Sequence, residues 1–558
     1  MPLRRSNGGP ELTNRYAKLF SSPLFIGLVL LFVAALVRFV GIGDAALRTD
    51  EIYHLLAGRS WADHGTLAMG DGLYTRARLY TMATGWFFQL FGPTPAVGRS
   101  LAAVAGVLLV VATALWARRR AEPLVAWTAG LLLCFSYTSI TSAQFARFYT
   151  WHALTVFLLA ITVYAGVTQL KTLGVRRLAL LAVTALLLLL ISIHLQATTF
   201  LMVLGLAVWA GLYLLFTGQL TFIIRSRMWT ALAGVAILLG LSVLWFERRL
   251  LWSMWRELRD AAAWSHENRD NFLFYVDLLG HQHSWLFYLL PIAAIIAWRR
   301  YRDLTFFCLT IVIVCLGLHS IAGMKALRYI YYVFPFMFVI WGCAVAIVGP
   351  PLVRYLVRLV SPWAGRAAPA LVGLGLLAAA APAFFVMTDY RLTVTGALRW
   401  IKTGSTWQPF NYGSTREEVD WAPYLPQLRK LQKDRLFVAT DSVRTLYYLD
   451  DYDLMLNKTE LSDAGSKEFS HDRRTGKIDI STGASLALVV KCYPRGSIIV
   501  SEARWRTPNV TDEAANMIER ITRPVALPPQ LRMRGYIWDG TAEKSPQCDR
   551  LRSMIRAN

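Results

Sequence analysis

Long apolar runs separated by short polar connections make up most of the first 390 residues. A helix needs about 20 apolar residues to cross the hydrocarbon core of a bilayer, and it must satisfy its own backbone hydrogen bonds there. The runs therefore predict about eleven membrane-spanning helices, some of them short. The runs cover residues 23–40, 95–116, 123–142, 150–170, 178–195, 197–217, 229–246, 284–298, 303–321, 329–348 and 368–388.

Basic residues cluster in alternate connections between these runs, all on the side of the N-terminus. The clusters are Arg118, Arg119 and Arg120; Lys171, Arg176 and Arg177; Arg225 and Arg227; Arg299, Arg300 and Arg302; and Arg354, Arg358 and Arg366. Because Lys and Arg concentrate in cytoplasmic loops, this side is predicted to be cytoplasmic. The first run is too long for a signal peptide and no A-x-A site follows it, so it is predicted to be a retained anchor.

The opposite side then holds two long loops, residues 41–94 and 247–283, and the tail of the chain. Residues 51–64 and 247–264 have the amphipathic pattern of helices that lie along a membrane surface, although ordinary connecting helices are the alternative. These loops contain nearly all the polar residues that a reaction could use.

The apolar periodicity ends near residue 391, and the tail has the composition of a soluble domain. Residues 436–440, 486–491 and 497–501 are predicted to be buried strands, and residues 442–449 and 511–521 to be helices. The tail contains neither G-x-G-x-x-G nor a P-loop, so nothing indicates a nucleotide site. We expect an α-helical polytopic membrane domain over residues 1–390 and a small extracytoplasmic α/β domain over residues 391–558.

Net charge and cysteines add two points. The formal net charge is +23, but the Lys and Arg residues lie between apolar runs, where they contact anionic lipid headgroups rather than nucleic acid. Four cysteines lie in apolar runs. Cys492 and Cys548 lie in the tail and are either a disulfide or two unrelated thiols. No cysteine spacing suits a metal.

The stretch Arg48-Thr-Asp-Glu-Ile-Tyr-His54 carries the most informative polar residues of the chain. Asp50 and Glu51 follow the first apolar run closely, so they lie at the membrane boundary. Carboxylates there are candidates for catalysis. The alternative is that they favour the N-terminus of a surface helix, where acidic side chains stabilise the helix dipole.

Arg147 lies in a very short outer connection, Ser142-Ala-Gln-Phe-Ala-Arg-Phe-Tyr-Thr-Trp-His152. A guanidinium suits a phosphate because its planar set of donors binds two oxygens at once. The alternative is that Arg147 reaches the lipid headgroups.

Lys325 and Arg328 lie in Lys325-Ala-Leu-Arg-Tyr329, on the predicted outer side and against the usual charge distribution. An anionic lipid phosphate would explain them. His281 and His283, in His281-Gln-His-Ser-Trp-Leu-Phe-Tyr288, face the same way only in an extended segment, and two histidines alone are a weak metal signal.

Together these motifs resemble the integral membrane glycosyltransferases of the C superfamily. The similarity lies in the Asp-Glu pair after the first span, the A-R-F-Y loop, and the H-x-x-x-W-x-x-Y and K-x-x-R-Y starts of two later spans. The layout is most similar to protein O-mannosyltransferases and aminoarabinose lipid A transferases. It covers residues 20–390, and the tail matches only the family's habit of a C-terminal extracytoplasmic domain.

The resemblance implies a polyprenyl-phosphate-linked sugar as donor and an extracytoplasmic lipid, glycan or protein as acceptor. Asp50 matches the catalytic aspartate and is expected to act as general base, and Glu51 to position sugar or acceptor. The residues expected to hold the donor phosphate are Arg147, Lys325, Arg328, Arg76 and Arg78. Those expected to contact sugar or acceptor are Tyr53, Tyr149, Gln144, His281, His283 and Tyr288.

Two departures from the family pattern concern the acceptor and the acid. Arg76 and Arg78 occupy the place where lipid A transferases carry a lysine-proline-proline element, and its absence argues against lipid A as acceptor. The next outer loop has Gln144 where those enzymes have an acid. A two-acid mechanism would need Asp260, Glu267 or Asp270. Attack on the anomeric carbon opposite to the phosphate predicts inversion of configuration. With the resemblance, the chain is expected to be an enzyme of a bacterial inner membrane, and a divalent cation is left open.

Two other functional classes are alternatives. A transporter or flippase for a lipid-linked glycan usually places working charges mid-membrane and often shows a repeat, whereas here the spans are nearly free of acids and no repeat is evident. A scaffold whose tail recruits partners would leave the outer charges without a role.

Overall fold

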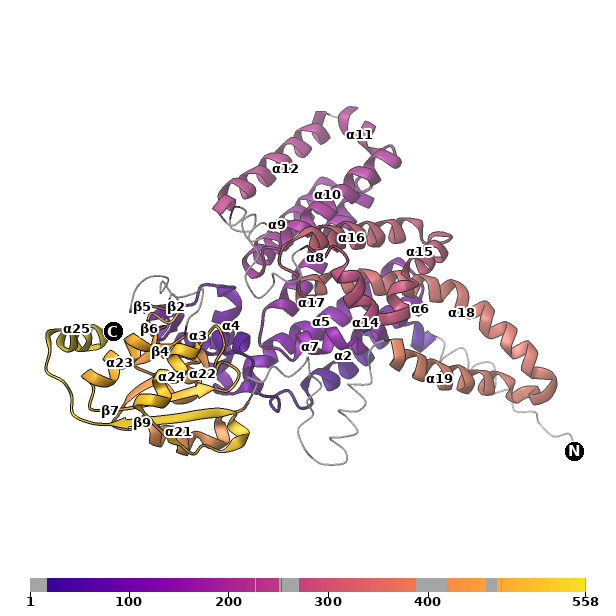
Figure 1. Cartoon of the computed structure of the whole chain (residues 1–558). Helices are drawn as coiled ribbons and strands as arrows, with labels where there is room; N and C mark the ends of the chain where they lie inside the picture. The colour runs from indigo at the N-terminus through magenta and orange to yellow at the C-terminus, as the bar shows by residue number, and fades with distance from the viewer. Residues whose placement is uncertain are drawn as a thin grey trace, which may run out of the picture. The chain divides into compact units, whose positions relative to one another are not determined.

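The computed structural model describes residues 18–225, 227–249, 252, 270–387, 419–457, 469–472 and 474–556, mostly as helices (Figure 1). The chain divides into two compact units. One comprises residues 1–40 and 102–409, and the other residues 41–101 and 410–558. The predicted boundary near residue 390 and most of residues 247–264 lie outside the described residues. The second unit therefore combines the first long loop with the tail.

Each predicted apolar run coincides with one or more helices. These are α2 (Pro23–Phe39), α5 (Pro95–Arg120), α6 (Pro123–Phe135), α7 (Tyr137–Ala143), α8 (Tyr149–Thr168), α9 (Val175–Leu195), α10 (Thr199–Phe216), α11 (Gln219–Arg225), α12 (Arg227–Phe246), α14 (Phe274–Tyr288), α15 (Leu290–Trp298), α16 (Arg302–Ile321), α17 (Leu327–Ile330), α18 (Phe334–Ala364) and α19 (Ala368–Met387). Among the described residues, six helical stretches are long and apolar enough to span a membrane, or seven if the bent α6–α7 pair is one span. The chain is thus a multi-pass membrane protein, and the number eleven stays a prediction.

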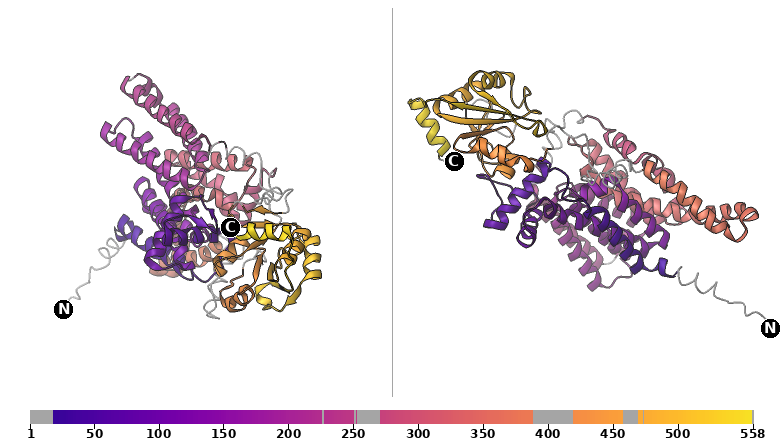
Figure 2. Two further views of the ribbon diagram at one scale, coloured as in Figure 1. Left: turned by 90° about the vertical axis from the view of Figure 1, so that its left-hand side faces the viewer. Right: turned by 90° about the horizontal axis from the view of Figure 1, so that it is seen from below.

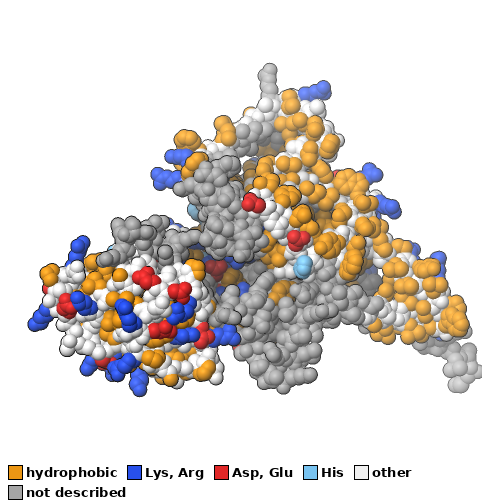
Figure 3. All heavy atoms as spheres, in the orientation of Figure 1, with side chains coloured by type: hydrophobic (Ala, Val, Ile, Leu, Met, Phe, Trp, Pro, Cys, Tyr) orange, Lys and Arg blue, Asp and Glu red, His pale blue; other side chains and the backbone are white. Residues whose placement is uncertain are grey.

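The surfaces of the two units differ in the side chains they carry. Apolar side chains cover the helices of the first unit, while charged side chains gather on the sheet-containing unit (Figure 3). Exposed Leu180, Leu187 and Phe216 on α9 and α10 suit contact with lipid tails, since apolar side chains lose nothing in hydrocarbon.

A buried arginine explains where α6 stops. The α6–α7 pair bends by 59° at Ser136. The guanidinium of Arg38, which is fully buried at the end of α2, donates to the carbonyl oxygens of Leu133 (3.3 Å) and Cys134 (3.1 Å) and to the Ser139 hydroxyl (2.7 Å). A cation favours the carbonyl end of a helix, so Arg38 satisfies groups that the break leaves without helical partners.

The second unit contains a seven-stranded sheet in the order β5-β6-β4-β3-β7-β9-β8 (Figures 1 and 2). Strands β6, β4, β3 and β7 are parallel, and β5, β9 and β8 are antiparallel to their neighbours. The strands are β3 (Leu436–Ala439), β4 (Leu454–Leu456), β5 (Ser470–His471), β6 (Ile478–Ile480), β7 (Arg495–Ser501), β8 (Arg523–Val525) and β9 (Met533–Asp539). This confirms the predicted α/β domain.

Helices cover both faces of the sheet. One apolar core lies between the sheet and α23 (Gly483–Cys492), α24 (Asp512–Ile521) and α25 (Pro546–Arg556). The other lies against α21 (Leu425–Gln432) and α22 (Ser442–Leu449), and it includes Met69 from the first long loop, with Tyr53 and Leu56 of α3 (Thr49–His64) packed against it. The first loop thus supplies part of the helical layer of the α/β unit.

One element prediction in the tail is wrong. Residues 486–491 were expected to form a strand, but they belong to helix α23. The Thr482 hydroxyl accepts the Ser485 backbone N–H (3.1 Å) and starts the helix, and Leu486, Val489 and Cys492 are buried at helical spacing. A short apolar run does not distinguish a strand from a buried helix, and here the cap decides.

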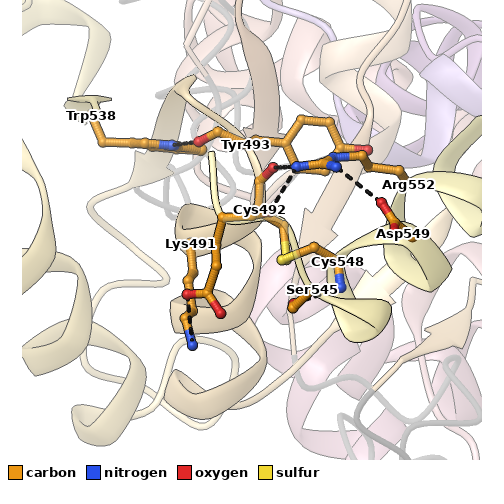
Figure 4. The surroundings of a disulfide bond; sticks show 9 residues. Lys491, Cys492, Tyr493, Trp538, Ser545, Cys548, Asp549 and Arg552 are labelled. Atoms are coloured by element: carbon orange, nitrogen blue, oxygen red, sulfur yellow. Dashed lines mark hydrogen bonds and ion pairs between the residues drawn. A yellow bond between two sulfur atoms is a disulfide. The ribbon is translucent and has the colours of Figure 1, made fainter. Parts of the chain in front are cut away.

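Cys492 and Cys548 form a disulfide, which settles the open question about them (Figure 4). The bond joins the end of α23 to α25, and Arg552 donates to the carbonyl oxygen of Cys492 (2.8 Å) beside it. Disulfides persist in oxidising compartments, so this bond agrees with an extracytoplasmic tail.

Replacing Cys548 by Ser is expected to destabilise the α/β unit by on the order of 2–4 kcal/mol, because the bond joins residues 56 apart in sequence and restricts the unfolded chain. Thermal unfolding of the purified protein measures the loss, and the reduced wild-type protein should match the variant. Peptide mapping without reduction should recover the two cysteines as one linked pair. Two freely alkylated thiols would contradict both the bond and the predicted side of the membrane.

Candidate functional site

Helix α3 begins at the Asp-Glu pair. The carboxylate of Glu51 accepts the backbone N–H of Arg48 (3.0 Å), and Asp50 and Glu51 both lie in the first turn, where acidic side chains stabilise the helix dipole. Asp50 is half-buried, whereas only 1% of Glu51 is exposed. The two adjacent acids therefore have different surroundings, and Asp50 is the more accessible one.

Arg99, near the start of α5, forms a bidentate ion pair with the carboxylate of Glu51. Its Nε donates to Glu51 Oε1 (2.7 Å) and its Nη2 to Oε2 (2.9 Å). The other guanidinium hydrogens donate to the carbonyl oxygens of Ile42, Ala45 and Ala46. All five donors of the guanidinium are thereby used. Glu51 was expected to position sugar or acceptor, and its carboxylate instead lies buried against Arg99, where it holds the chain on either side of Asp50.

Sequence reasoning missed Arg99. A signal was present, because a cation near the start of an apolar helix lies at the unfavourable end of the helix dipole and needs a compensating acid. What the sequence did not show was that the acid is Glu51, 48 residues earlier.

Tyr53 lies one turn after Asp50 on α3. Its ring stacks on Tyr74 (centroids 5.5 Å apart, 7° between planes), and its hydroxyl accepts a hydrogen bond from Arg474. Burial raises the pKa of Tyr53 to about 12, with Arg474 opposing the shift and the carboxylates of Asp441, Asp50 and Asp472 adding to it. Tyr53 is therefore a neutral hydrogen-bond donor at physiological pH.

Other contacts hold α3 within the α/β unit. Arg444 of α22 donates to the carbonyl oxygen of Leu47 (3.4 Å), just before α3 begins. The His54 ring bonds Thr81 (2.8 Å) on α4 (Arg78–Phe91). Arg76 and Arg78, predicted to hold phosphate, are exposed residues before and at the start of α4, and their role stays a prediction.

The first unit brings two of the predicted motifs together. The guanidinium carbon of Arg147 lies 5.7 Å from the centre of the Tyr149 ring, and that of Arg328 lies 5.3 Å from the Tyr329 ring. The Tyr149 and Tyr329 rings are themselves in contact, with centroids 6.3 Å apart. The A-R-F-Y loop and the K-x-x-R-Y segment, 181 residues apart at their arginines (328 less 147), thus form one cationic and aromatic cluster.

Lys325 belongs to the same segment and is almost fully buried. Its Nζ donates to the carbonyl oxygen of Ala322 (2.6 Å), directly after α16 ends, where a cation is favourable. Tyr275 fixes the segment, because its hydroxyl donates to the Ala326 carbonyl oxygen (3.3 Å) and accepts the Ala326 N–H (3.2 Å). Arg147, Lys325 and Arg328 therefore place three positive charges on a constrained part of the chain.

Gln144 is placed differently from the other predicted contacts. Its side-chain nitrogen lies within 3.4 Å of the carbonyl oxygens of Val37, Arg38 and Val40, at the end of α2. The amide thereby satisfies backbone groups that the helix leaves open. This geometry indicates a capping role for its nitrogen.

The two histidines do not act as a pair. Helix α14 contains both, so they point to different faces: His281 is exposed and its Nδ1 bonds the Asp277 carbonyl oxygen (2.9 Å), while His283 is buried against the Phe334 ring. Among the described residues, no group of three or more His, Cys, Asp or Glu side chains could hold a metal ion.

Tyr288 lines an apolar groove of about 590 Å³ on the first unit. The groove lies between α14, α15 and α16. Its walls include Val276, Pro291, Ile295, Trp298, Val312 and Ile313. Such a groove in a membrane-spanning unit suits a hydrocarbon chain better than a sugar.

Two crystal structures of ArnT from Cupriavidus metallidurans are similar to this chain. The apo structure has a TM-score of 0.60 and 16% sequence identity, covering 91% of this chain and 97% of that one. The structure bound to undecaprenyl phosphate has the same TM-score and identity and covers 93% and 99%. No protein-family model and no curated protein matches the chain.

An oligosaccharyltransferase, AglB from Archaeoglobus fulgidus in complex with an inhibitory peptide and a dolichol-phosphate, has a TM-score of 0.44 at 15% identity and covers 76% of this chain and 63% of that one. That TM-score is too low to carry an argument. The ArnT likeness extends over nearly all of both chains. It shows that this chain has the same fold as those ArnT structures.

Proposed function

We propose that this chain is a C-superfamily glycosyltransferase and transfers a sugar from a polyprenyl phosphate to an extracytoplasmic acceptor. The observation that carries the proposal is the match to a structure bound to undecaprenyl phosphate over 93% of this chain and 99% of that one. Such a transfer requires a carboxylate that can take a proton and a cluster of cations that can hold the phosphate. The chain's own residues supply both.

Asp50 is proposed as the general base. Its carboxylate takes the proton from the acceptor's nucleophilic O–H or N–H group while the acceptor's oxygen or nitrogen attacks the anomeric carbon. The bond between that carbon and the phosphate oxygen breaks, and the lipid phosphate leaves with the electron pair. Attack opposite to the leaving group inverts the configuration. Phosphate is a good leaving group, so no acid is needed on that side.

The cationic cluster is proposed to hold the donor phosphate. Arg147, Lys325 and Arg328 would balance the charge that grows on the phosphate as the bond breaks. The apolar groove at Tyr288 is the proposed seat of part of the polyprenyl chain. Tyr53 and Tyr149 remain the proposed contacts to sugar or acceptor.

The predicted orientation belongs to the same proposal. Transfer from a polyprenyl phosphate at the outer face needs the α3 loop and the tail outside the cytoplasm. The Cys492–Cys548 bond supports that side, because a disulfide is stable there and not in a reducing cytoplasm.

Mass spectrometry of envelope lipids, glycans and proteins from cells with and without the protein tests the proposal. A single sugar residue missing from one class of molecule would identify both substrates. Loss of a flippase would remove the same sugar, but the lipid-linked sugar would then accumulate on the cytoplasmic side of the membrane.

Replacing Arg147 by Ala is expected to weaken binding of undecaprenyl phosphate at least tenfold and to lower turnover, because a bidentate guanidinium contact to phosphate is lost. Arg147→Lys should recover part of the affinity, since it restores the charge but not the planar donors. Lipid binding to protein in nanodiscs measures both. Arg119→Ala removes an exposed arginine at the end of α5 and is the control. Equal affinity of all these variants would assign Arg147 to lipid headgroups.

A further inference from the structure

A turn in the C-terminal part of the chain packs against the first long loop, which carries the proposed base Asp50. The described residues of the turn are Asp472 and residues 474–477, between β5 and β6. The turn packs on the small hairpin of β1 (Ala68–Met69) and β2 (Gly72–Leu73), where the Asp71 N–H donates to the Thr475 carbonyl oxygen (2.7 Å). A side chain on Gly72 would collide with the carbonyl oxygen of Arg474. Only glycine therefore allows this approach.

Arg474 of this turn is rigidly held. Its Nη2 donates to Asp472 Oδ2 (2.9 Å) and its Nε lies near Oδ1 (3.3 Å). Asp472 is fully buried, and its Oδ1 also accepts the backbone N–H groups of Arg474 (2.7 Å) and Thr475 (3.3 Å). The Nε and Nη2 atoms of the guanidinium are thus held by a buried carboxylate, and Nη1 lies on the other side of the group.

The Nη1 side of the guanidinium reaches Tyr53. Arg474 Nη1 donates to the Tyr53 hydroxyl oxygen, and the guanidinium carbon lies 5.5 Å from the centre of the Tyr53 ring. Tyr74 stacks on the same ring. The phenol is therefore held along its ring face and at its oxygen. Because Arg474 uses a lone pair of that oxygen, the O–H hydrogen must point elsewhere.

Tyr53 and Asp50 are three residues apart on α3. Positions i and i+3 of a helix lie on the same face, about one turn apart. A hydroxyl fixed at Tyr53 is thus within reach of a group that Asp50 deprotonates. The contact to the hydroxyl oxygen comes from Arg474, which lies 421 residues later in the sequence.

We propose that Arg474 is a positioning residue: it orients the Tyr53 hydroxyl so that Tyr53 donates a hydrogen bond to an oxygen of the sugar or the acceptor beside Asp50. The α/β unit is then part of the transfer machinery rather than a recruiting module. This inference rests on the proposed function of Asp50, and it adds a residue that lies outside the motifs shared with the family.

Transfer rates of four variants test the inference. In isolated membranes of a deletion strain, Arg474→Ala should lower kcat about tenfold and leave the KM for the lipid donor unchanged, because the donor phosphate site is intact. Tyr53→Phe should have a similar effect, and the double variant should lose no more than either single one. Lys477→Ala is the matched control. Lys477 lies on the same turn and pairs with Asp71 (3.3 Å) and Asp451 (3.0 Å), so its loss removes a tether but no contact to Tyr53.

A second measurement does not depend on activity. With 3-fluorotyrosine at position 53 of the full chain, fluorine NMR follows the ionisation of that ring. A nearby cation favours the phenolate, so removing Arg474 should raise the pKa of the fluorotyrosine, and Lys477→Ala should leave it unchanged.

The outcomes separate the two proposals. An unchanged fluorine titration in Arg474→Ala would overturn the contact. A fully additive loss in the double variant would overturn the positioning role and make Arg474 merely structural. Full activity of Asp50→Asn would instead remove the proposed base, while the titration would still report the Arg474–Tyr53 contact.

Discussion

Replacing Asp50 by Asn is expected to abolish transfer almost entirely, lowering the rate by a factor of about 10² or more. General base catalysis typically supplies that much, and asparagine has the same shape without the ability to take a proton. Asp50 is half-buried at the start of α3, so the substitution should leave the fold and membrane insertion intact. The measurement is the extent of sugar modification in a deletion strain that expresses the variant.

Asp63→Asn is the matched control for this experiment. Asp63 is exposed near the other end of the same helix, so its replacement changes the charge of α3 equally and should leave transfer unaffected. Thermal unfolding of both variants should agree with that of the wild-type protein. If Asp50→Asn retained more than about a tenth of the activity, Asp50 would not be the base.

Replacing Glu51 by Gln is expected to destabilise the first turn of α3 by about 3–5 kcal/mol. The substitution leaves the buried guanidinium of Arg99 without its counter-charge, and breaking a buried ion pair on one side costs about that much. Hydrogen exchange of the α3 backbone amides, followed by mass spectrometry, measures the free energy of local opening. The rate of sugar transfer should fall as well, because Asp50 lies in the same turn of α3.

An exposed ion pair in the same unit is the control for Glu51→Gln. Arg429 and Asp450 are 3.4 Å apart, and 59% and 69% of their side chains are exposed. Arg429→Ala should change the exchange of its surroundings by about 1 kcal/mol or less, as is typical of surface pairs. Equal exchange of α3 in Glu51→Gln and the wild-type protein would show that Arg99 does not stabilise the turn.

Much of the fold followed from local patterns. The eleven apolar runs all fall on helices, because a chain inside a bilayer must satisfy its backbone groups within the segment itself. Strands 436–440 and 497–501 and helices 442–449 and 511–521 were also predicted correctly, since buried runs and capping residues are local signals. Residues 486–491 were assigned to a strand because a short apolar run lacks a distinguishing period. The cap at Thr482 shows that these residues belong to a helix, which begins about one turn before them.

The candidate site was only partly open to such reasoning. The Asp50-Glu51 pair stands out by its place after an apolar run, and Arg147, Lys325 and Arg328 by their charge on the predicted outer side. Which of the two acids is accessible did not follow from their order. It depends on Arg99, whose guanidinium reaches Glu51 and not Asp50.

The sequence by itself determined the properties that each segment carries alone: a helical membrane chain, an α/β tail and a set of candidate polar residues between the apolar runs. The tertiary structure decided everything that joins distant segments. It paired Cys492 with Cys548, buried Glu51 against Arg99, brought the Arg147 and Arg328 motifs together and placed Arg474 on Tyr53. The physical reason is that apolar spacing and helix caps act within a few residues, whereas ion pairs and packed rings depend on where the folded chain returns.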